Sequence, residues 1–492
     1  MELADELRRA LDVVCATGAP EVRENGEWLA ALDGVSYEVR PQGDAAVLHL
    51  WSAQQSLVRR VLRLAEQASD RVVVEVARFG NARPVQLEFV AHGNRREPRR
   101  VDRGQFCDRL RRVLTDHFPD ETVDSLTTTA DLHRSLSGSY TRGIVYRGSE
   151  AVAVLGASPN EDGATIDGML TFGLIWLQQA RERAKRHSVT GLRLFLPRET
   201  STITAHRMRA LASPCAVELY EYDPLHWRVQ RIAVSDAGNL ATRITARHEI
   251  EQAIAAAMPE AERIQRLVPE AIRIGVAPAS QEVTLRFRGL EFARWRLGAM
   301  WFGLGDRQEV LTPGKWPALE ALVRQLEIHR HPLASDTKHR LYRAQPERWL
   351  ETMVAADPSR IDARLDARQM YTQVPAFSSG DRGMIDLLAT TRDGRLAVIE
   401  LKASEDIQLV MQAVDYWLRV RWHHEQDDFR RYGYFSEVPL KAKSPLLFLV
   451  APGFRFHPAN DIVIRYLSTE IEVVRIALGE NWRRTLKVMF RQ

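Results

Sequence analysis

The sequence has little cysteine, no long hydrophobic run and no strong excess of charge of one sign. Only Cys15, Cys107 and Cys215 occur among its 492 residues, and none forms a Cys-x-x-Cys pair. This excludes a zinc ribbon and argues against a disulfide framework. The apolar run 446–452 is among the longest, and it has the length of a strand rather than the ~20 residues of a membrane span. With 68 Lys and Arg against 64 Asp and Glu, the net charge of +4 permits a nucleic-acid partner without arguing for one.

The residues that are present predict a globular protein of alternating strands and helices. Hydrophobic residues make up 45% and charged residues 27% of the chain, an ordinary balance for such a protein. Strand patterns alternate with helical ones, such as the helices expected at 1–15 and 57–67. We therefore expect an α/β (α+β) protein whose mixed sheets are covered by helices on both faces. The acidic, amphipathic N-terminus is unlike a signal peptide, so we expect a cytoplasmic protein with no membrane partner.

Two parts of the sequence repeat. The strand pair at 382–386 and 397–404 resembles the pair at 142–146 and 151–158. The later copy has three charged residues where the earlier one has none, and the predicted equivalences are Asp386 with Tyr146, Glu400 with Val154 and Lys402 with Gly156. A fainter match, in which Trp51 and Trp316 are each followed six residues later by Leu-Val-Arg, predicts that the whole chain consists of two related halves.

The charged residues of the later copy lie in strands that are otherwise apolar. Strand 396–402 carries Glu400 and Lys402, and the alternation of side chains along a strand puts both on one face. The preceding strand contributes Asp386, and a turn that contains Asp393-Gly394 joins the two strands. Burying such charges costs several kcal/mol unless they are paired or bind an ion. The sequence therefore predicts that the three side chains converge, either as a salt bridge without chemistry or as a reactive site.

The reactive alternative has a definite chemistry. Two converging carboxylates suit Mg²⁺ or Mn²⁺, which prefer oxygen ligands and keep bound waters. Such an ion polarises a phosphodiester oxygen and lowers the pKa of a bound water. A lysine beside it positions or deprotonates that water and offsets charge that develops on the phosphate. Together these effects favour hydrolysis of a nucleic-acid backbone.

The arrangement of Asp386, a hairpin and Glu400-Leu401-Lys402 resembles the signature of the PD-(D/E)XK nuclease superfamily. The segment Gln412-Ala-Val-Asp-Tyr416 matches the Gln-x-x-x-Tyr helix motif of its RecB-like branch. The stretch 347–416, with the Asp357-Pro358 turn, is similar to the nuclease domain of prokaryotic mismatch-specific endonucleases. The match covers about residues 338–492, so mismatch specificity does not carry over to the chain.

The resemblance implies a role for each motif residue. Asp386 and Glu400 would be metal ligands with the Leu401 carbonyl as a third, and Lys402 would be the catalytic lysine. Gln412 and Tyr416 would orient the phosphate or the lysine, unless they are merely the edge of an amphipathic helix. The family often adds a glutamate from its first helix, and Glu347 and Glu351, one turn apart, both qualify. Ile385 stands where the family's name has proline.

These expectations define an organisation and a function. We expect an α+β module at 1–98, a catalytically empty nuclease-like domain at 99–235, a second α+β module at 236–337 and the nuclease domain at 338–492, the two nuclease-like domains having restriction-endonuclease-like α/β/α folds. The expected function is Mg²⁺- or Mn²⁺-dependent hydrolysis of DNA. The alternatives are a non-cleaving nucleic-acid-binding or assembly protein and a regulated prokaryotic defence nuclease. The resemblance also implies a homodimer as one arrangement, and it leaves DNA versus RNA and endo- versus exonuclease action open.

Overall fold

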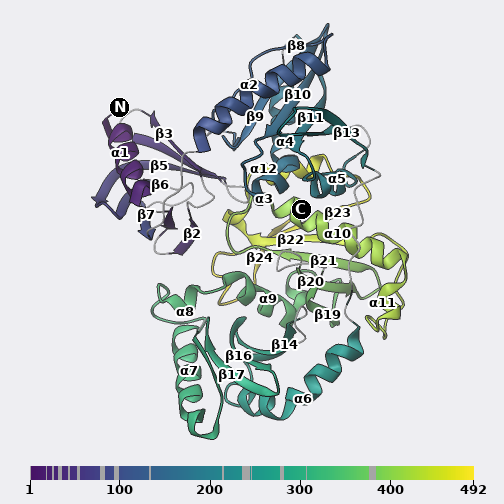
Figure 1. Cartoon of the computed structure of the whole chain (residues 1–492). Helices are drawn as coiled ribbons and strands as arrows, with labels where there is room; N and C mark the ends of the chain where they lie inside the picture. The colour runs from purple at the N-terminus through teal and green to yellow at the C-terminus, as the bar shows by residue number, and fades with distance from the viewer. Residues whose placement is uncertain are drawn as a thin grey trace. The chain divides into compact units, whose positions relative to one another are not determined.

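The computed structural model describes residues 2–492 except 18, 25–26, 32–35, 43–44, 52–55, 78–83, 93–98, 132–133, 185, 213–214, 235–243, 245, 278–281, 306 and 376–383 (Figure 1). The chain forms two compact units. The first unit comprises Met1–Gly238, Asp406–Met411 and His457–Ser468, and the second comprises Asn239–Glu405, Gln412–Phe456 and Thr469–Gln492. Each of the four predicted domain ranges contains one β-sheet. The boundaries between those ranges stay predictions. No helix among the described residues is long and apolar enough to cross a membrane.

The N-terminal sheet is antiparallel and is packed against one helix. Helix α1 (Glu2–Thr17) buries Leu7, Leu11 and Val14, the face that the helical spacing predicts. The sheet has the order β2-β1-β7-β6-β5-β4-β3. Its strands are β1 (Ala19–Glu24), β2 (Glu27–Ala31), β3 (Ser36–Gln42), β4 (Ala45–Trp51), β5 (Ser56–Gln67), β6 (Arg71–Ala77) and β7 (Val85–His92).

The helix predicted at 57–67 is wrong, because these residues form β5. The strand pairs with β4 on one side and β6 on the other. Its register with β6 shifts twice, between Val61 and Arg63 and between Leu64 and Glu66. Each irregularity adds a residue and breaks the alternation of a strand, so that the apolar residues recur at a spacing that imitates a helix. Arg59 is buried in this strand and is paired with Glu24 at 2.7 Å.

A buried histidine on β4 makes this part of the fold sensitive to acid. Burial lowers the pKa of His49 to about 3, and His457 and Arg40 lower it further while Asp131 opposes them. In the unfolded chain His49 takes up a proton below a pH of about 6.5, so stability is lost as the pH falls from there toward 3. We expect His49→Gln to remove this loss. When the pH is lowered from ~7 to ~4.5, the unfolding free energy of the wild type should therefore fall by about 2–3 kcal/mol more than that of the variant.

Urea unfolding at several pH values measures this difference. The exposed His226 provides a matched control as His226→Gln, which we expect to follow the wild type. Parallel pH profiles for His49→Gln and the wild type would contradict the prediction.

Two six-stranded sheets share one topology. In each, the first three strands are antiparallel, the third to fifth are parallel and the last is antiparallel. The earlier sheet contains β8 (Thr122–Val123), β9 (Tyr140–Arg147), β10 (Glu150–Ala157), β11 (Ser188–Pro197), β12 (Ala216–Tyr222) and β13 (Val229–Ile232). The later sheet contains β19 (Leu365–Pro375), β20 (Met384–Thr391), β21 (Leu396–Leu401), β22 (Leu446–Pro452), β23 (Glu472–Leu478) and β24 (Val488–Arg491).

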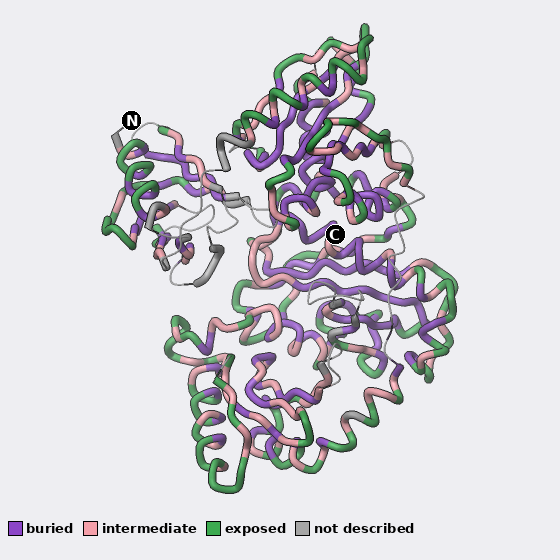
Figure 2. The backbone as a smooth tube through the Cα atoms, viewed as in Figure 1, coloured by how far each residue is buried: buried purple, intermediate pink, exposed green. Residues whose placement is uncertain are grey.

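In both copies a helix precedes the sheet, a long helix follows the hairpin and a shorter helix follows the next strand, and each copy has one further short helix at a different place. The earlier copy has α2 (Arg99–His117), α3 (Gly163–Asp167), α4 (Met169–Arg183) and α5 (Thr202–Met208), and the later copy has α9 (Pro346–Ala356), α10 (Leu409–Glu425), α11 (Asp428–Arg431) and α12 (Ala459–Arg465). Within the first unit, α12 packs on α4. Every residue of β21 and β22 is buried, as the strands in Figure 2 show, because neighbouring strands and covering helices enclose them. This confirms the predicted α/β class.

The packing of the strands corrects the residue equivalences of the sequence repeat. Ile399 of β21 packs in one cluster with Trp349 of α9. Val154 of β10 packs with Phe106 of α2, the helix in the corresponding position of the earlier copy. Val154 therefore lies on the face of Ile399 and not on that of Glu400. The predicted equivalence is wrong because a shift of one residue exchanges the two faces of a strand.

The parallel strands give the corrected equivalences. The strand that pairs with each hairpin ends on a proline, Pro197 in β11 and Pro452 in β22. If the two prolines are matched, Gly191 of β11 corresponds to Leu446 of β22. Gly191 pairs with Val152 and Leu446 pairs with Ala397, so Val152 corresponds to Ala397. The strand registers then give the earlier sheet's counterparts of Asp386, Glu400 and Lys402 as Arg142, Leu155 and Ala157, in place of Tyr146, Val154 and Gly156. The earlier copy still has no carboxylate at these positions.

The second module is an antiparallel sheet with strands in sequence order. It contains α6 (Arg247–Gln265), β14 (Ile272–Ala277), β15 (Glu282–Phe287), β16 (Leu290–Arg296), β17 (Ala299–Leu304), β18 (Arg307–Val310), α7 (Trp316–His329) and α8 (Arg340–Arg343). The fainter sequence match falls on the end of β4 and on β5 at Trp51, but on α7 at Trp316. It is therefore wrong as a structural equivalence, and the two modules have sheets of different strand order.

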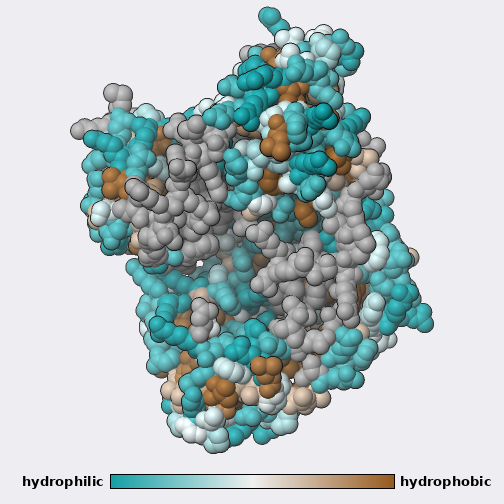
Figure 3. Space-filling view, in the orientation of Figure 1, coloured by the Kyte–Doolittle hydropathy of each residue, from teal (hydrophilic) through white to brown (hydrophobic). Residues whose placement is uncertain are grey.

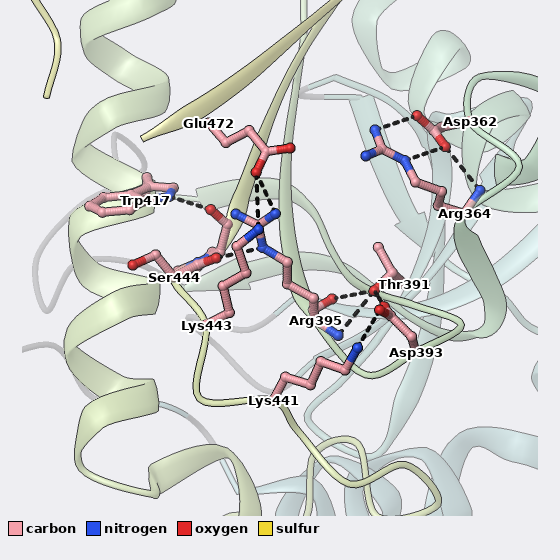
Figure 4. Close-up of polar contacts among 11 residues, drawn as sticks. Asp362, Arg364, Thr391, Asp393, Arg395, Trp417, Lys441, Lys443, Ser444 and Glu472 are labelled. Carbon is pink, nitrogen blue, oxygen red and sulfur yellow. Dashed lines mark hydrogen bonds and ion pairs between the residues drawn. The ribbon is translucent and has the colours of Figure 1, made fainter. Parts of the chain in front are cut away.

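A polar network anchors the hairpin end of β21, away from Glu400 (Figure 4). Arg395 donates to the Ser444 carbonyl at 2.7 Å and to Glu472 at 2.6 Å, which ties β21 to the starts of β22 and β23. Trp417 of α10 donates to the Pro445 carbonyl at 2.8 Å. The network fixes the relative positions of three strands and α10, and it leaves the opposite end of β21 to the charged residues.

Exposed apolar side chains are scattered over the surface. The large ones include Leu225 and Leu297, which lie in separate turns, and Phe454, which lies in the short 3-10 helix Gly453–Arg455. On the face that Figure 3 shows, hydrophilic side chains predominate and hydrophobic ones form small groups. Single exposed apolar residues are normal on a protein surface and indicate no partner.

Candidate active site

The hairpin of β20 and β21 brings Asp386 and Glu400 together. The strand ladder pairs Leu387 with Ile399, and one further step of the same register sets Asp386 opposite Glu400. Residues opposite each other in an antiparallel pair have Cβ atoms about 4.5–5.5 Å apart. Here a side chain continues the ladder, since the Leu401 N–H donates to Oδ2 of Asp386 at 3.0 Å. The carboxylate of Asp386 is thereby fixed at the end of β21.

Lys402 lies beside this carboxylate pair. Its Nζ is 3.5 Å from Oε1 of Glu400, and the exposed fractions of the two side chains are 13% and 2%. The backbone N–H of Lys402 donates to the Val450 carbonyl of β22 at 3.0 Å, which holds the residue just beyond the end of β21. The structure thus brings together the three charged side chains that the sequence singles out.

Helix α9 carries the two candidate carboxylates, Glu347 and Glu351, and their surroundings differ. The helix packs across β19, β20 and β21. Glu351 is 5% exposed, and its Oε2 accepts from Nη1 of Arg348 at 2.8 Å. The same Nη1 is 3.7 Å from Oδ1 of Asp386, so one guanidinium links the two carboxylates. Glu347, one turn earlier, is only half-buried.

The pKa values of these carboxyl groups reflect their burial. Burial raises the pKa of Glu351 to about 7, and Asp386 adds to the rise, while Arg348 and Arg286 oppose it. Burial also raises the pKa of Asp386, and Lys402, Arg348 and the Leu401 N–H act against the rise. Charged carboxylates here are costly without a cation close by, which is the electrostatic setting of many functional sites.

The motif residues of α10 lie near the same carboxylates. Gln412 donates from Nε2 to the Tyr416 hydroxyl at 3.2 Å, and Tyr416 is 2% exposed. Burial raises the pKa of Tyr416, and the charge of Glu400 raises it further. Tyr416 therefore stays a neutral hydroxyl beside Glu400. The predicted Gln-x-x-x-Tyr pair is formed and faces the site, and its role in orienting a phosphate or the lysine stays a prediction.

The second module holds α9 in place. Arg330, the residue that follows α7, is fully buried and donates to carbonyl oxygens on both sides of the junction, those of Phe287, Arg288, Leu341, Ala344 and Gln345. Gly289, with φ +84°, lies so close to α9 that a Cβ atom there would come within 2.2 Å of the Arg348 carbonyl oxygen. The turn between β15 and β16 therefore packs directly on the segment that carries Arg348 and Glu351.

The sequence did not reveal several of these features. Strand β19, the role of the second module in supporting α9, and the cations Arg348 and Arg286 were not predicted. Arg286 comes from β15 and influences Glu351 across a contact between elements far apart in sequence. The one local signal is the spacing of Arg348 and Glu351, three residues apart on a helix, which places them on one face.

The donor atoms of the site suit a hard divalent cation. Asp386, Glu400 and Glu351 offer carboxylate oxygens only, and Mg²⁺ is commonly bound through one or two carboxylates while it keeps several waters. In a strand the N–H and C=O of one residue point to the same side, so the Leu401 carbonyl faces the side of Asp386, to which its N–H donates. In the part of the chain that is described, no three His, Cys, Asp or Glu side chains are already grouped to hold a metal ion. The chemistry of the donors fits the cation, and Arg348 is the positive group now beside two of them.

Comparison with known proteins adds little. No protein-family model matches the sequence, and no curated protein matches it. Among solved structures the chain is similar to the crystal structure of a repair endonuclease from Pyrococcus abyssi, with 10% sequence identity over 45% of this chain and 96% of that chain. The TM-score is 0.17, so this likeness carries no argument about the fold or the site.

Proposed function

We propose that the chain is a metal-dependent nuclease that hydrolyses DNA phosphodiester bonds at the end of β21. The observation that carries the proposal is the convergence of Asp386, Glu400 and Lys402 within a buried part of a mixed sheet. Three charges in that setting need more compensation than one ion pair provides. The choice of DNA rests on the resemblance of the sequence to PD-(D/E)XK nucleases.

Each residue has a role that its position supports. Asp386 and Glu400, with Glu351 and the Leu401 carbonyl, would hold Mg²⁺ or Mn²⁺. Such an ion polarises the scissile phosphate and acidifies a bound water. Lys402 would orient the attacking water and donate a hydrogen bond to the phosphate oxygen that gains charge. The neutral hydroxyl of Tyr416, which Gln412 holds by a hydrogen bond, would keep Lys402 and Glu400 correctly oriented toward each other.

The earlier copy would be a related domain without catalysis. Its sheet has the same strand order and directions, and its counterparts of the three site residues are Arg142, Leu155 and Ala157. We propose that it arose by internal duplication and serves as a scaffold or a DNA-binding surface.

A cleavage assay tests the function. The full chain, with Mg²⁺ or Mn²⁺, is incubated with linear duplex, circular, single-stranded and mismatched DNA and with RNA of the same sequence. We expect cleavage that disappears with a chelator and falls at least about a hundredfold in Asp386→Asn. Glu351→Gln should also lose activity, while Glu347→Gln, the matched carboxylate one turn away, should stay within about threefold of the wild type.

Residual cleavage that is equal in the wild type and Asp386→Asn would contradict the proposal. DNA binding with no cleavage under any condition would favour a non-cleaving binding protein. Cleavage that appears only when a cell extract or a signalling ligand is added would favour a regulated defence nuclease.

A further inference from the structure

Arg348 does not belong to the nuclease motif, yet its side chain lies next to two of the candidate metal ligands. Its Nη1 is 2.8 Å from Oε2 of Glu351 and 3.7 Å from Oδ1 of Asp386. These two carboxylates come from different elements, α9 and β20, and the guanidinium is the positive group that approaches both. A charge-assisted hydrogen bond of 2.8 Å is a strong interaction in a partly dry environment. The guanidinium therefore lies in the position that a metal ion bound by both carboxylates would take.

The side chain of Arg348 can also move away from the two carboxylates. Its side chain is 34% exposed, whereas that of Glu351 is 6% exposed, so the guanidinium has a path to solvent and the carboxylate does not. Arg348 lies in the first turn of α9, where its backbone is fixed by the contact with Gly289. Because the backbone is fixed, the guanidinium can make room for another cation by a movement of the side chain alone. Rotation about its side-chain torsions achieves this without any change in the core.

The other cations near the site differ from Arg348. Lys402 is paired with Glu400, and its charge also acts on Asp386. Arg286 acts on Glu351 from β15, is largely buried, and has its pKa lowered by burial. Neither is given a contact with both Glu351 and Asp386. Arg348 is thus the side chain whose guanidinium lies near both carboxylates.

We propose that Arg348 is a built-in counter-ion that competes with the divalent cation for Glu351 and Asp386, and that it swings to solvent when the cation binds. The inference rests on the metal site of the proposed function. It means that metal affinity is held below what the carboxylates alone would give. If the guanidinium occupies the carboxylates about 90% of the time, the apparent affinity is reduced about tenfold.

Calorimetric titration of Mn²⁺ into the full chain tests the competition. The titration is run at a pH of about 8, above the pKa of about 7 to which burial raises Glu351. We expect Arg348→Met, which keeps the length and removes the charge, to lower the apparent dissociation constant about tenfold. Arg348→Lys, which keeps the charge, should bind Mn²⁺ within about threefold of the wild type.

A matched control lies twelve residues further along the chain. Arg360 forms the same three-residue-spaced ion pair with Asp357, at 3.0 Å and outside the site. We expect Arg360→Met to bind Mn²⁺ as the wild type does. Arg348→Gln serves as a second uncharged variant in case Arg348→Met is not folded.

The outcomes separate this inference from the proposed function. Unchanged or weaker Mn²⁺ binding in the folded uncharged variants overturns the competition, even if the wild type cleaves DNA. Tighter binding with no cleavage by any protein supports the competition and overturns the nuclease. No Mn²⁺ heat with any protein overturns both.

Discussion

Replacing Lys402 with methionine is expected to lower the single-turnover rate of DNA cleavage about a thousandfold, within the range for loss of a positioned proton-transfer or charge-stabilising group. The Nζ of Lys402 is 3.5 Å from Oε1 of Glu400, and its side chain is 13% exposed, so water cannot easily take its place. Methionine keeps the length and the apolar stem of lysine, which limits the change to the charge and the hydrogen bonds.

The same substitution has a structural effect that must be measured separately. Glu400 loses the cation nearest to it, and breaking one side of a buried pair costs about 3–5 kcal/mol. Cleavage is therefore compared at a temperature at which circular dichroism shows both proteins to be folded. We expect Mn²⁺ binding to persist in Lys402→Met, because the substitution removes no oxygen ligand.

A matched control is available at the other end of the same hairpin. Lys441 is paired with Asp393 near the start of β21, and both side chains are more than half exposed (Figure 4). Lys441→Met should cleave within about twofold of the wild type, since surface pairs contribute little. A rate for Lys402→Met within tenfold of the wild type would mean that Lys402 only balances the charge of Glu400.

Arg330→Leu is expected to cause the largest loss of stability, about 4 kcal/mol or more. The guanidinium is fully buried and donates to five carbonyl oxygens between the second module and the start of α9. Each buried acceptor that loses its donor costs about 1–3 kcal/mol, and leucine supplies none of the lost bonds. The ring of Trp349, 4.7 Å from the guanidinium, also loses a cation–π contact.

Urea unfolding followed by tryptophan fluorescence measures this loss. Arg324→Leu provides the control, because Arg324 lies on the same helix and is exposed. We expect that control to stay within about 0.5 kcal/mol of the wild type. A loss of less than about 1 kcal/mol in Arg330→Leu would show that the junction is held by other contacts.

The core of the candidate site could be predicted from sequence because the relevant rules are local. Asp386, Glu400 and Lys402 stand out as charges in apolar strands, and the alternation of side chains with a short connection brings them together. The choice between Glu347 and Glu351 could not be made, since both lie on the same helix face. It depends on how α9 is rotated over the sheet, which the contacts with Gly289 and Arg330 decide.

Two errors in the sequence interpretation share one cause. The helix expected at 57–67 and the equivalence of Val154 with Glu400 both relied on spacing along one strand. In β5 the irregular register with β6 alters that spacing. In the repeat, the two hairpins differ in length, and a similarity of letters cannot reveal a shift of one residue. Only the pairing with neighbouring strands shows which face a residue occupies.

The sequence by itself determined the α/β class and the three charged residues at one end of a strand hairpin. Burial of an apolar strand and the cost of a buried charge are properties of the residues themselves. The tertiary structure alone decided the partners that come from elsewhere in the chain: Glu351 and Arg348 beside Asp386, Arg286 near Glu351, and Arg330 beneath α9. Those contacts join segments far apart in sequence, so their geometry arises only when α9 packs on the later sheet and the second module packs on α9.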